Sequence, residues 1–275
     1  MPYDIAPILN CLHAKHDIDF TGYRISLIER QLTQRFSATS CDNVAEYLHY
    51  LQSNPDELDS LLDALTIHVS RFFRDPLTFE YIAHRVLPEV VHRKKELMDP
   101  SLRVWSAGCS MGEEPYSAAI LIHELLEKEG LNLRVHIFAT DIDEKILARA
   151  VRAEFPFESI SEVKFGLLKK YFMSKEDVFQ LKPEIRTAVS FSVYDILDRK
   201  TVAPAESVFG SFDIVFCRNL LIYFDAEHQE RIFGKLYRSL SQNGFLVLGG
   251  TEIPPLRYQM YFKKVNDYCH IYQRA

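Results

Sequence analysis

The stretch from Leu102 to Ser117, LRVWSAGCSMGEEPYS, constrains the fold of this chain more than any other. Its alternating apolar residues predict a short strand that enters a buried sheet. Gly108 and Gly112 then bracket a tight turn, and Pro115 stands where a helix takes its first residues. A strand, a loop of small residues and a helix N-terminus together predict a cradle for a ligand.

The same loop carries two carboxylates, Glu113 and Glu114, at the start of the expected helix. Negative charge at that position suits the helix dipole but repels a phosphate group. The G-x-G-x-x-G pattern that is typical of dinucleotide binding is absent from the loop. The loop therefore favours a ligand that is neutral or positively charged where it meets the helix.

The composition excludes several classes of protein. With 275 residues, 47% of them hydrophobic and 25% charged, the chain has enough apolar material for one large domain or two modest ones. Its formal net charge of −6 argues against a general nucleic-acid-binding protein. No apolar run approaches the roughly 20 residues that span a bilayer, and the first residues show no signal peptide. We therefore expect a cytoplasmic protein without direct membrane insertion and without a nucleic-acid partner.

The spacing of cysteine and histidine predicts neither a disulfide framework nor a metal site. The chain has 5 cysteines and 10 histidines, and none of them forms a CxxC, HxxxH or HExxH pattern. Scattered cysteines in odd number are typical of reduced thiols in the cytoplasm.

The first part of the chain, residues 1–93, predicts an N-terminal helical domain. Leucines recur at helical spacing between Leu48 and Leu65, and Asn54-Pro55 marks a break between two helices. The basic run HRKK begins a linker near residues 92–101, so that a second domain covers residues 94–275.

Arg24, Arg30 and Arg35 form a weakly basic stretch that is opposed only by Glu29. Two interpretations stay open, because this spacing need not place the three side chains on one face of a helix. They are either ordinary arginines of a solvated helix or a docking face for an acidic partner helix.

From Leu102 onward, strands alternate with helices, which favours an α/β fold with a mainly parallel sheet. Strands are expected at residues 102–107, 135–140, 189–192, 212–217 and 245–249, and helices end near 128, 153 and 240. The pattern weakens near residues 155–188, where we expect a small β insertion. The end of the chain, around Asn266-Asp267, predicts a terminal antiparallel hairpin.

Polar residues follow three of the expected strands: the Gly108–Glu114 loop, Asp141, and the pair Arg218-Asn219. Ligands of open α/β sheets bind outside the carboxyl ends of the strands, and an acidic residue after the second strand commonly binds the ribose hydroxyls of a nucleoside. Asp141 alone could instead cap the helix that follows it. The three positions together, beside an acidic loop without a phosphate motif, favour S-adenosylmethionine over NAD, because that cofactor is cationic and carries no phosphate.

A competing motif lies in the same loop. GCSMG matches the G-x-S-x-G elbow of α/β-hydrolases, with Ser110 as the nucleophile. Asp213 or Asp225, and then His270, could complete the order Ser, Asp, His. The elbow normally follows several strands of the sheet, however, whereas here it follows the first.

Whole motifs add a family resemblance. LRVWSAGCSMGEEPYSAAIL resembles the signature of CheR-type chemotaxis-receptor glutamate methyltransferases. VSRFFRDP, IFATDID, FDIVFCRNLLIYFD and NGFLVLGGTE resemble the other blocks of that family in the same order, so that the resemblance covers nearly the whole chain. It implies a Rossmann-like methyltransferase fold with a terminal antiparallel hairpin, an all-α N-terminal domain and a small β insertion near residues 155–188. It also implies methyl transfer from S-adenosylmethionine to glutamate side chains of chemoreceptor helices.

The resemblance further implies the residues of the site. Cofactor contacts fall on His68, Ser70, Arg74, Glu114, Asp141, Asp195, Ile196, Arg218 and Asn219, and the residues near the transferred methyl match Arg74 and Tyr223. The chain departs from the family at His68 and Asp195, where Asn is more usual. It also departs at residues 249–252, where GGTE replaces the family's GHSE.

The resemblance makes Arg24, Arg30 and Arg35 candidates for reading acidic receptor helices. The segment between Tyr171 and Val189 is short for a member that grips a receptor C-terminal pentapeptide, so we expect no tight pentapeptide binding. We expect a monomer that uses no metal. A cofactor-binding signalling scaffold without methyl transfer, and a serine hydrolase that uses Ser110, remain as alternatives.

Overall fold

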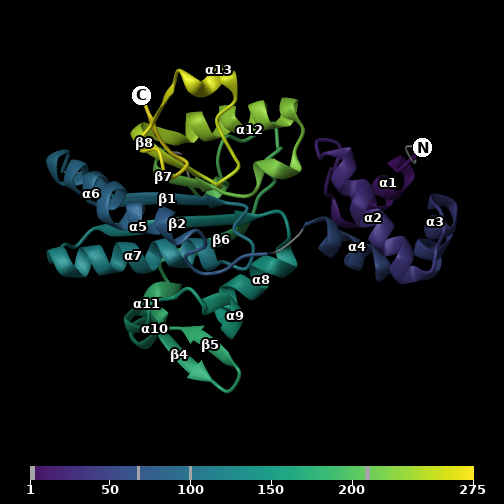
Figure 1. The fold of residues 1–275 in the computed structure, drawn as a ribbon, viewed down its shortest axis with the longest axis horizontal. Coiled ribbons are helices and arrows are strands. Elements are labelled where there is room, and N and C mark those ends of the chain that lie inside the picture. Colours follow the sequence, from purple (N-terminus) through teal and green to yellow (C-terminus); the bar gives the residue numbers. More distant parts are fainter. Residues whose placement is uncertain (1–3, 67–68, 99–100, 208–210) are drawn as a thin grey trace. The chain divides into compact units, whose positions relative to one another are not determined.

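The computed structural model describes residues 4–66, 69–98, 101–207 and 211–275 of the protein. The chain forms two compact units, which can be followed along the sequence by colour in Figure 1. The first comprises Met1–His68 and Ile222–His228, and the second comprises Val69–Leu221 and Gln229–Ala275. A short piece of the later chain therefore belongs to the N-terminal unit.

The first unit is a helical domain. Its helices are α1 (Ala6–His16), α2 (Ile25–Thr39), α3 (Val44–Ser53) and α4 (Glu57–Leu65). Apolar residues at helical spacing, such as Ile28 and Leu32 in α2, are buried in its interior. α3 begins with a reciprocal cap, since the Asn43 side chain accepts the N–H of Glu46 at 3.0 Å and the Glu46 carboxylate accepts the N–H of Asp42 at 2.9 Å.

The second unit is built on a seven-stranded sheet with the strand order β6-β2-β1-β7-β8-β10-β9. Its strands are β1 (Ser101–Ala107), β2 (Arg134–Asp141), β6 (Val189–Val193), β7 (Phe212–Cys217), β8 (Leu240–Leu248), β9 (Phe262–Lys264) and β10 (Ile271–Arg274). Neighbours from β6 to β8 are parallel, whereas β10 pairs antiparallel with both β8 and β9. Every residue of β7 is buried, as expected of a parallel strand with both faces covered.

Helices cover this sheet. They are α5 (Pro76–Tyr81), the π-helical segment η1 (Ile82–Val86), α6 (Leu87–Glu96), α7 (Glu113–Glu129), α8 (Glu144–Arg152) and α12 (Ala226–Ser239), with shorter segments η2 (Ala205–Ser207) and α13 (Leu256–Gln259). The short helix η3 (Leu221–Tyr223) runs into the segment Ile222–His228 of the first unit. In Figure 1, α7 and α12 lie on opposite sides of the sheet.

A separate small sheet follows α8. It has the order β3-β5-β4 and consists of antiparallel strands β3 (Glu154–Pro156), β4 (Phe172–Lys175) and β5 (Val178–Leu181). Short helices α9 (Phe157–Ile160), α10 (Phe165–Tyr171) and α11 (Pro183–Arg186) accompany it. The predicted fold class is confirmed: a mainly parallel sheet with a terminal antiparallel hairpin, an all-α N-terminal domain and a small β insertion.

The two units part at residue 68, earlier than the boundary predicted near residues 92–101. α5, η1 and α6 pack into the core of the second unit, where Phe79 and Val90 join the sheet residues Val104 and Ile214. An amphipathic pattern shows which face of a helix is buried but not against which core, so the sequence could not assign these helices. Among the described helices, none is long and apolar enough to cross a membrane.

Candidate active site

Four parallel strands bring their carboxyl ends to one edge of the sheet, and each is followed by a polar loop. The Gly108–Gly112 loop follows β1, Asp141 ends β2, Arg218 and Asn219 follow β7, and the Gly249–Glu252 turn follows β8. Because parallel strands end on the same side, these loops form one site. The sequence predicted the first three loops, and the fourth is an addition from the structure.

The loop after β1 is fixed against the end of β2. The N–H groups of Gly108 and Cys109 both donate to the Thr140 carbonyl, at 2.8 and 2.9 Å. Gly108 and Gly112 have φ values of 72° and 92°, a region that favours glycine, and Ser110 shares it with φ 51°. A Cβ at Gly112 would lie 3.1 Å from the Phe191 ring. The tight turn therefore also depends on the absence of a side chain at this position.

Asp141 holds the loop and does not cap the next helix. Its Oδ2 accepts the N–H of Ser110 at 2.8 Å, and its Oδ1 accepts the N–H of Asp143 at 3.2 Å. The cap of α8 is Asp143, whose Oδ1 accepts the N–H groups of Lys145 and Ile146. The two acidic residues therefore have separate roles, which favours the ribose interpretation of Asp141 over the capping one.

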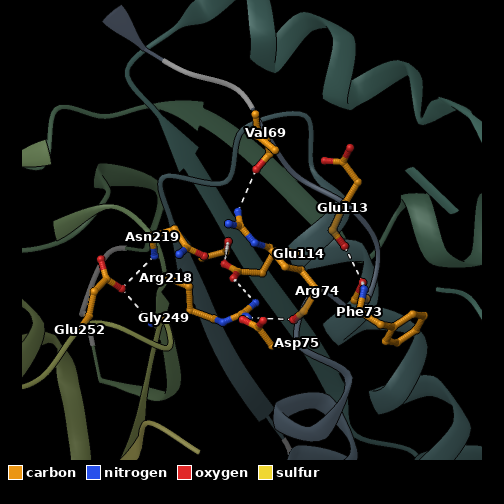
Figure 2. A network of polar contacts seen from close by, with 12 residues as sticks. Val69, Phe73, Arg74, Asp75, Glu113, Glu114, Arg218, Asn219, Gly249 and Glu252 are labelled. Atoms are coloured by element: carbon orange, nitrogen blue, oxygen red, sulfur yellow. Dashed lines mark hydrogen bonds and ion pairs between the residues drawn. The ribbon is translucent and has the colours of Figure 1, made fainter. Parts of the chain in front are cut away.

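Glu114 forms the floor of the site together with Arg218 (Figure 2). Glu114 Oε1 accepts the Ser106 hydroxyl at 2.7 Å, and Oε2 accepts Nη1 of Arg218 at 3.2 Å. Burial raises the pKa of the Glu114 carboxyl, and the adjacent Arg218 guanidinium acts in the opposite direction. The floor is thus a buried carboxylate with its own counter-ion.

Arg218, predicted as a cofactor contact, also binds groups of the protein itself. Its side chain is only 2% exposed, and its Nη2 donates to the backbone carbonyl of Arg74 at 2.8 Å and to the Asp75 carboxylate. With Nη1 on Glu114, both terminal nitrogens are engaged by protein groups. Arg218 therefore ties the Glu114 floor to the backbone that carries Arg74, as Figure 2 shows.

Arg74 lies in a strained turn. The residues on either side of it, Phe73 and Asp75, have φ values of 53° and 61°. Its Nη1 donates to the Val69 carbonyl at 2.9 Å, and its other guanidinium N–H groups have no partner among the residues that the structure describes. Since a guanidinium has five N–H donors, most of the fork stays available to a further hydrogen-bond acceptor.

The two glutamates of the loop point in different directions (Figure 2). Glu113 is fully buried, and its carboxylate accepts the Ser159 hydroxyl at 3.2 Å. Burial raises its pKa, while hydrogen bonds from its own backbone, Ser159 and Ser70 act against that rise. Ser70, predicted as a cofactor contact, thus lies near the Glu113 carboxylate.

The remaining predicted cofactor residues have different environments. Asp195 and Ile196 follow β6, beside the N–H of Tyr194 that donates to the Asp141 carbonyl at 3.0 Å. The Asp195 carboxylate accepts the N–H of Leu197 at 2.7 Å, and Ile196 is buried. Tyr223 belongs to the first compact unit, and His68 lies outside the described residues.

Sequence reasoning missed Glu252. Its side chain is 4% exposed, and its carboxylate accepts three backbone N–H groups, from Asn219 and Leu221 at 2.8 Å and from Gly249 at 2.7 Å. It thereby holds Asn219 in the left-handed region, with φ 56°, at the end of β7. A Cβ at Gly249 would lie 2.7 Å from the Glu252 carboxylate, so the glycine three residues earlier is the one sequence signal for this contact.

We expect Glu252→Gln to weaken the affinity for S-adenosylhomocysteine by about tenfold, because an amide NH₂ would face a buried N–H and leave it unsatisfied, at a cost of about 1–3 kcal/mol. Calorimetric titration measures this. Thr251→Ala, at the exposed neighbouring position, is the matched control and should bind as the wild type does. Equal affinities for Glu252→Gln and the wild type would contradict this role of Glu252.

The residues of the hydrolase alternative are not arranged as a catalytic triad. His270 Nδ1 hydrogen-bonds the backbone carbonyl of Glu252, and Asp213 pairs with Lys94 at 2.9 Å. Asp225 pairs with His228 within the first unit. Ser110 Oγ is buried and has no hydrogen-bond partner among the described residues. A catalytic triad requires a nucleophile, a base and an orienting acid in mutual contact. These residues do not form such an arrangement.

The three predicted docking arginines differ in their contacts with the rest of the protein. Arg35 donates to the Glu57 carboxylate through Nε at 2.8 Å and Nη2 at 2.6 Å, and the Tyr47 hydroxyl donates to the same carboxylate at 2.6 Å. Arg24 Nε donates to the Phe224 carbonyl at 2.9 Å. Arg30 alone of the three is exposed without a hydrogen bond or ion pair to any described residue.

The site fits a cationic cofactor without phosphate. The one buried guanidinium at the strand ends, Arg218, is neutralised by Glu114 and Asp75 and cannot serve a phosphate. Ser110 Oγ and Arg218 Nε are buried without a partner among the described residues, which suits a further ligand at these loops. Among those residues, no group of His, Cys, Asp and Glu side chains could hold a metal ion.

Two family models match the chain along most of its length. The model "CheR methyltransferase, SAM binding domain" matches residues 68–269, and "CheR methyltransferase, all-alpha domain" matches residues 4–66. Together they confirm the resemblance on which the site residues were predicted.

Similar curated proteins support the same family assignment. The chain is 33% identical to chemotaxis protein methyltransferase 2 of Vibrio cholerae, over 90% of this chain and 85% of the relative. It is 34% identical to chemotaxis protein methyltransferase 1 of Pseudomonas aeruginosa, over 85% of both chains. An uncharacterized 104.1 kDa protein of Rhodobacter capsulatus is 30% identical over 89% of this chain, which spans only 25% of that relative.

Solved structures give a weaker likeness. The rRNA methyltransferase aviRa from Streptomyces viridochromogenes is 14% identical with a TM-score of 0.38, and covers 69% of this chain and 82% of its own. A likeness at this level supports no residue-level comparison. The family models carry the identification, and the one described as a SAM-binding domain covers residues 68–269, which include the strand-end loops of the second unit. This chain therefore belongs to the CheR family of chemotaxis protein methyltransferases and binds S-adenosylmethionine as its cofactor.

Proposed function

We propose that this protein is a cytoplasmic protein-glutamate O-methyltransferase that modifies chemoreceptors. It transfers the methyl group of S-adenosylmethionine to the γ-carboxylates of glutamates on receptor helices, giving glutamate methyl esters and S-adenosylhomocysteine. The observation that carries this proposal is the strand-end network of Glu114, Arg218 and Asp75, which offers an acidic floor to a cation and leaves the Arg74 side chain beside it.

The reaction requires little acid–base catalysis by the protein. A glutamate carboxylate has a pKa near 4.3 and is already an ionised nucleophile at neutral pH. Its oxygen forms the new bond to the methyl carbon while the carbon–sulfur bond breaks and its electron pair stays on sulfur. Bound S-adenosylmethionine supplies the electrophilic methyl group. The protein contributes alignment, which can be worth roughly 7–11 kcal/mol.

Arg74 orients the substrate carboxylate through the free part of its guanidinium fork, and Tyr223 hydrogen-bonds near the transferred methyl. The remaining cofactor contacts that we propose are His68, Ser70, Glu114, Asp141, Asp195, Ile196 and Asn219. Arg218 positions Glu114 and the Arg74 backbone, and its Nε, which is buried without a partner among the described residues, is the part that we propose contacts the cofactor. The ribose hydroxyls of the cofactor bind to Asp141.

The receptor helices are the proposed partner, and the protein works as a monomer. The small sheet has short strands, with β4 of four residues at its edge, so we expect no tight binding of a receptor C-terminal pentapeptide. Titration with such a peptide should show no saturation at micromolar concentration. A micromolar dissociation constant would contradict this expectation.

Incubation of the purified protein with methyl-labelled S-adenosylmethionine and membranes that contain chemoreceptors tests the proposal. We expect label on the receptor band in proportion to time and enzyme. A chain that binds S-adenosylhomocysteine in calorimetry but transfers no label to any receptor would be the signalling scaffold, and the proposal would fail.

A further inference from the structure

The segment that carries Tyr223 is paired with a loop of the N-terminal helical unit. The Arg24 N–H donates to the Tyr223 carbonyl at 2.8 Å, and the Asp225 N–H donates to the Gly22 carbonyl at 3.1 Å. Tyr23 and Phe224 form an antiparallel β-bridge between these two hydrogen bonds. A short two-stranded ladder thus joins the loop Phe20–Arg24 to the segment Ile222–His228 within one compact unit.

Side chains reinforce the pairing. Arg24 Nε donates to the Phe224 carbonyl at 2.9 Å, so that one arginine binds two successive carbonyls of the segment, one through its backbone and one through its side chain. The rings of Tyr23 and Phe224 lie 4.8 Å apart in an edge-on arrangement, and Phe224 is 1% exposed. Aromatic pairs of this kind add to the stability of the contact beyond the area that they bury.

Gly22 allows the close approach on which the pairing depends. A Cβ at this position would lie 2.5 Å from the imidazole of His228. That imidazole is fixed in turn, because its Nδ1 is 2.8 Å from the Asp225 carboxylate, which also accepts the His228 N–H at 2.9 Å. Gly22 is the only glycine before Gly108 in the sequence, and its lack of a side chain is used at this contact.

We propose that Arg24 and Gly22 are positioning residues for methyl transfer, and that the Phe20–Arg24 loop is part of the catalytic apparatus because it fixes the backbone of Tyr223. The inference rests on the proposed function, in which Tyr223 lies near the transferred methyl. It gives Arg24 a role inside the protein, in place of the receptor docking that its charge suggested.

If Arg24 and Gly22 position Tyr223, their loss should change kcat and leave KM nearly unchanged. A displaced Tyr223 impairs a step that occurs after both ligands have bound, and misplacement by about 1 Å can cost about a hundredfold in rate. Arg24→Ala and Gly22→Ala should therefore lower kcat, by about tenfold or more, while KM for the receptor and the affinity for S-adenosylhomocysteine stay near the wild-type values. Arg24→Lys keeps the charge and should recover little of the rate, because a lysine lacks the planar Nε–H that meets the Phe224 carbonyl.

Arg30→Ala is the matched comparison, since Arg30 is an exposed arginine of α2. A docking role would raise the receptor KM in Arg30→Ala and in Arg24→Ala alike. If Arg24→Ala raises KM with kcat unchanged, or if Arg24→Lys restores full activity, the positioning role is wrong. Circular dichroism melting identifies any variant that fails to fold, and Gly22→Ala then provides the second, independent test.

A double-mutant cycle with Tyr223→Phe separates this inference from the proposed function. Residues that act through one another show non-additive effects, so Arg24→Ala should cost little more in the Tyr223→Phe background. If Tyr223→Phe leaves kcat unchanged, the proposed role of Tyr223 fails. If Tyr223→Phe is impaired but Arg24→Ala is not, or if the two effects add fully, the inference alone fails. A chemoreceptor cytoplasmic fragment serves as substrate in all of these assays.

Discussion

Arg74→Ala is expected to lower the rate of methyl transfer by about a hundredfold or more while it changes the affinity for S-adenosylhomocysteine by much less, because orientation of the attacking group is the main contribution of the protein. The backbone of Arg74 is held by Arg218, whose side chain does not change in this variant. The cofactor floor at Glu114 therefore stays in place, and the loss falls on the substrate carboxylate. Initial rates with a saturating receptor fragment and calorimetry with S-adenosylhomocysteine measure the two effects.

Arg71→Ala is the matched control for this prediction. Arg71 lies three residues earlier and forms an exposed ion pair with Glu162, at 3.0 Å. Exposed pairs contribute about 0–1 kcal/mol to stability, so activity should stay within about twofold of the wild type. Equal losses of rate and of cofactor affinity in Arg74→Ala would show that Arg74 acts on the cofactor and would overturn its role at the substrate.

Asp141→Ala is expected to weaken the binding of S-adenosylhomocysteine by about tenfold to a hundredfold, since each hydrogen bond from a ribose hydroxyl to a carboxylate is worth about 1.5–3 kcal/mol. The same change leaves the Ser110 N–H without its acceptor and loosens the loop after β1. Both effects act on the cofactor, so kcat at saturating cofactor should fall less than the affinity does.

The control for Asp141 is its neighbour two residues on. Asp143→Ala removes the N-cap of α8, which should cost about 0.5–2 kcal/mol of stability and lower the melting temperature. It should leave the cofactor affinity close to that of the wild type. If both variants lose affinity to the same extent, Asp141 acts only through the local fold and the ribose role is wrong.

The sequence predicted the parts of the fold that depend on local patterns. The strand, tight turn and acidic helix start at Leu102–Ser117 are where the alternation, the two glycines and Pro115 indicated, because those signals act over a few residues. The alternation of strands and helices likewise predicted the parallel sheet, whose topology then places Asp141 and Asn219 at one edge.

Contacts between distant residues were not predictable in the same way. Arg35 looked like a surface arginine, but Glu57 of another helix neutralises it, and no periodic pattern reports a pairing 22 residues apart. Glu113 and Glu114 looked like one acidic patch, yet one turns to Ser159 and the other to Arg218. No partner side chain in the sequence indicated the role of Glu252, because its partners are backbone N–H groups, which every sequence contains.

The sequence likewise did not predict to which compact unit Tyr223 belongs. The residue follows β7, a strand of the large sheet, yet the segment Ile222–His228 belongs to the same compact unit as the N-terminal helices. The paired hydrogen bonds to Gly22 and Arg24, which the sequence does not show, reveal the connection. A motif can thus identify a candidate catalytic residue without revealing which part of the protein positions it.

The chemistry of the modified receptor distinguishes glutamate methylation from every other outcome. Receptor fragments incubated with this protein and S-adenosylmethionine are digested and analysed by mass spectrometry, before and after mild alkaline treatment. The account predicts single methyl additions on glutamate-containing peptides that alkali removes as methanol, since carboxylate esters are base-labile. Methyl groups that survive alkali on lysine or arginine, or an unmodified receptor with active cofactor binding, would contradict it.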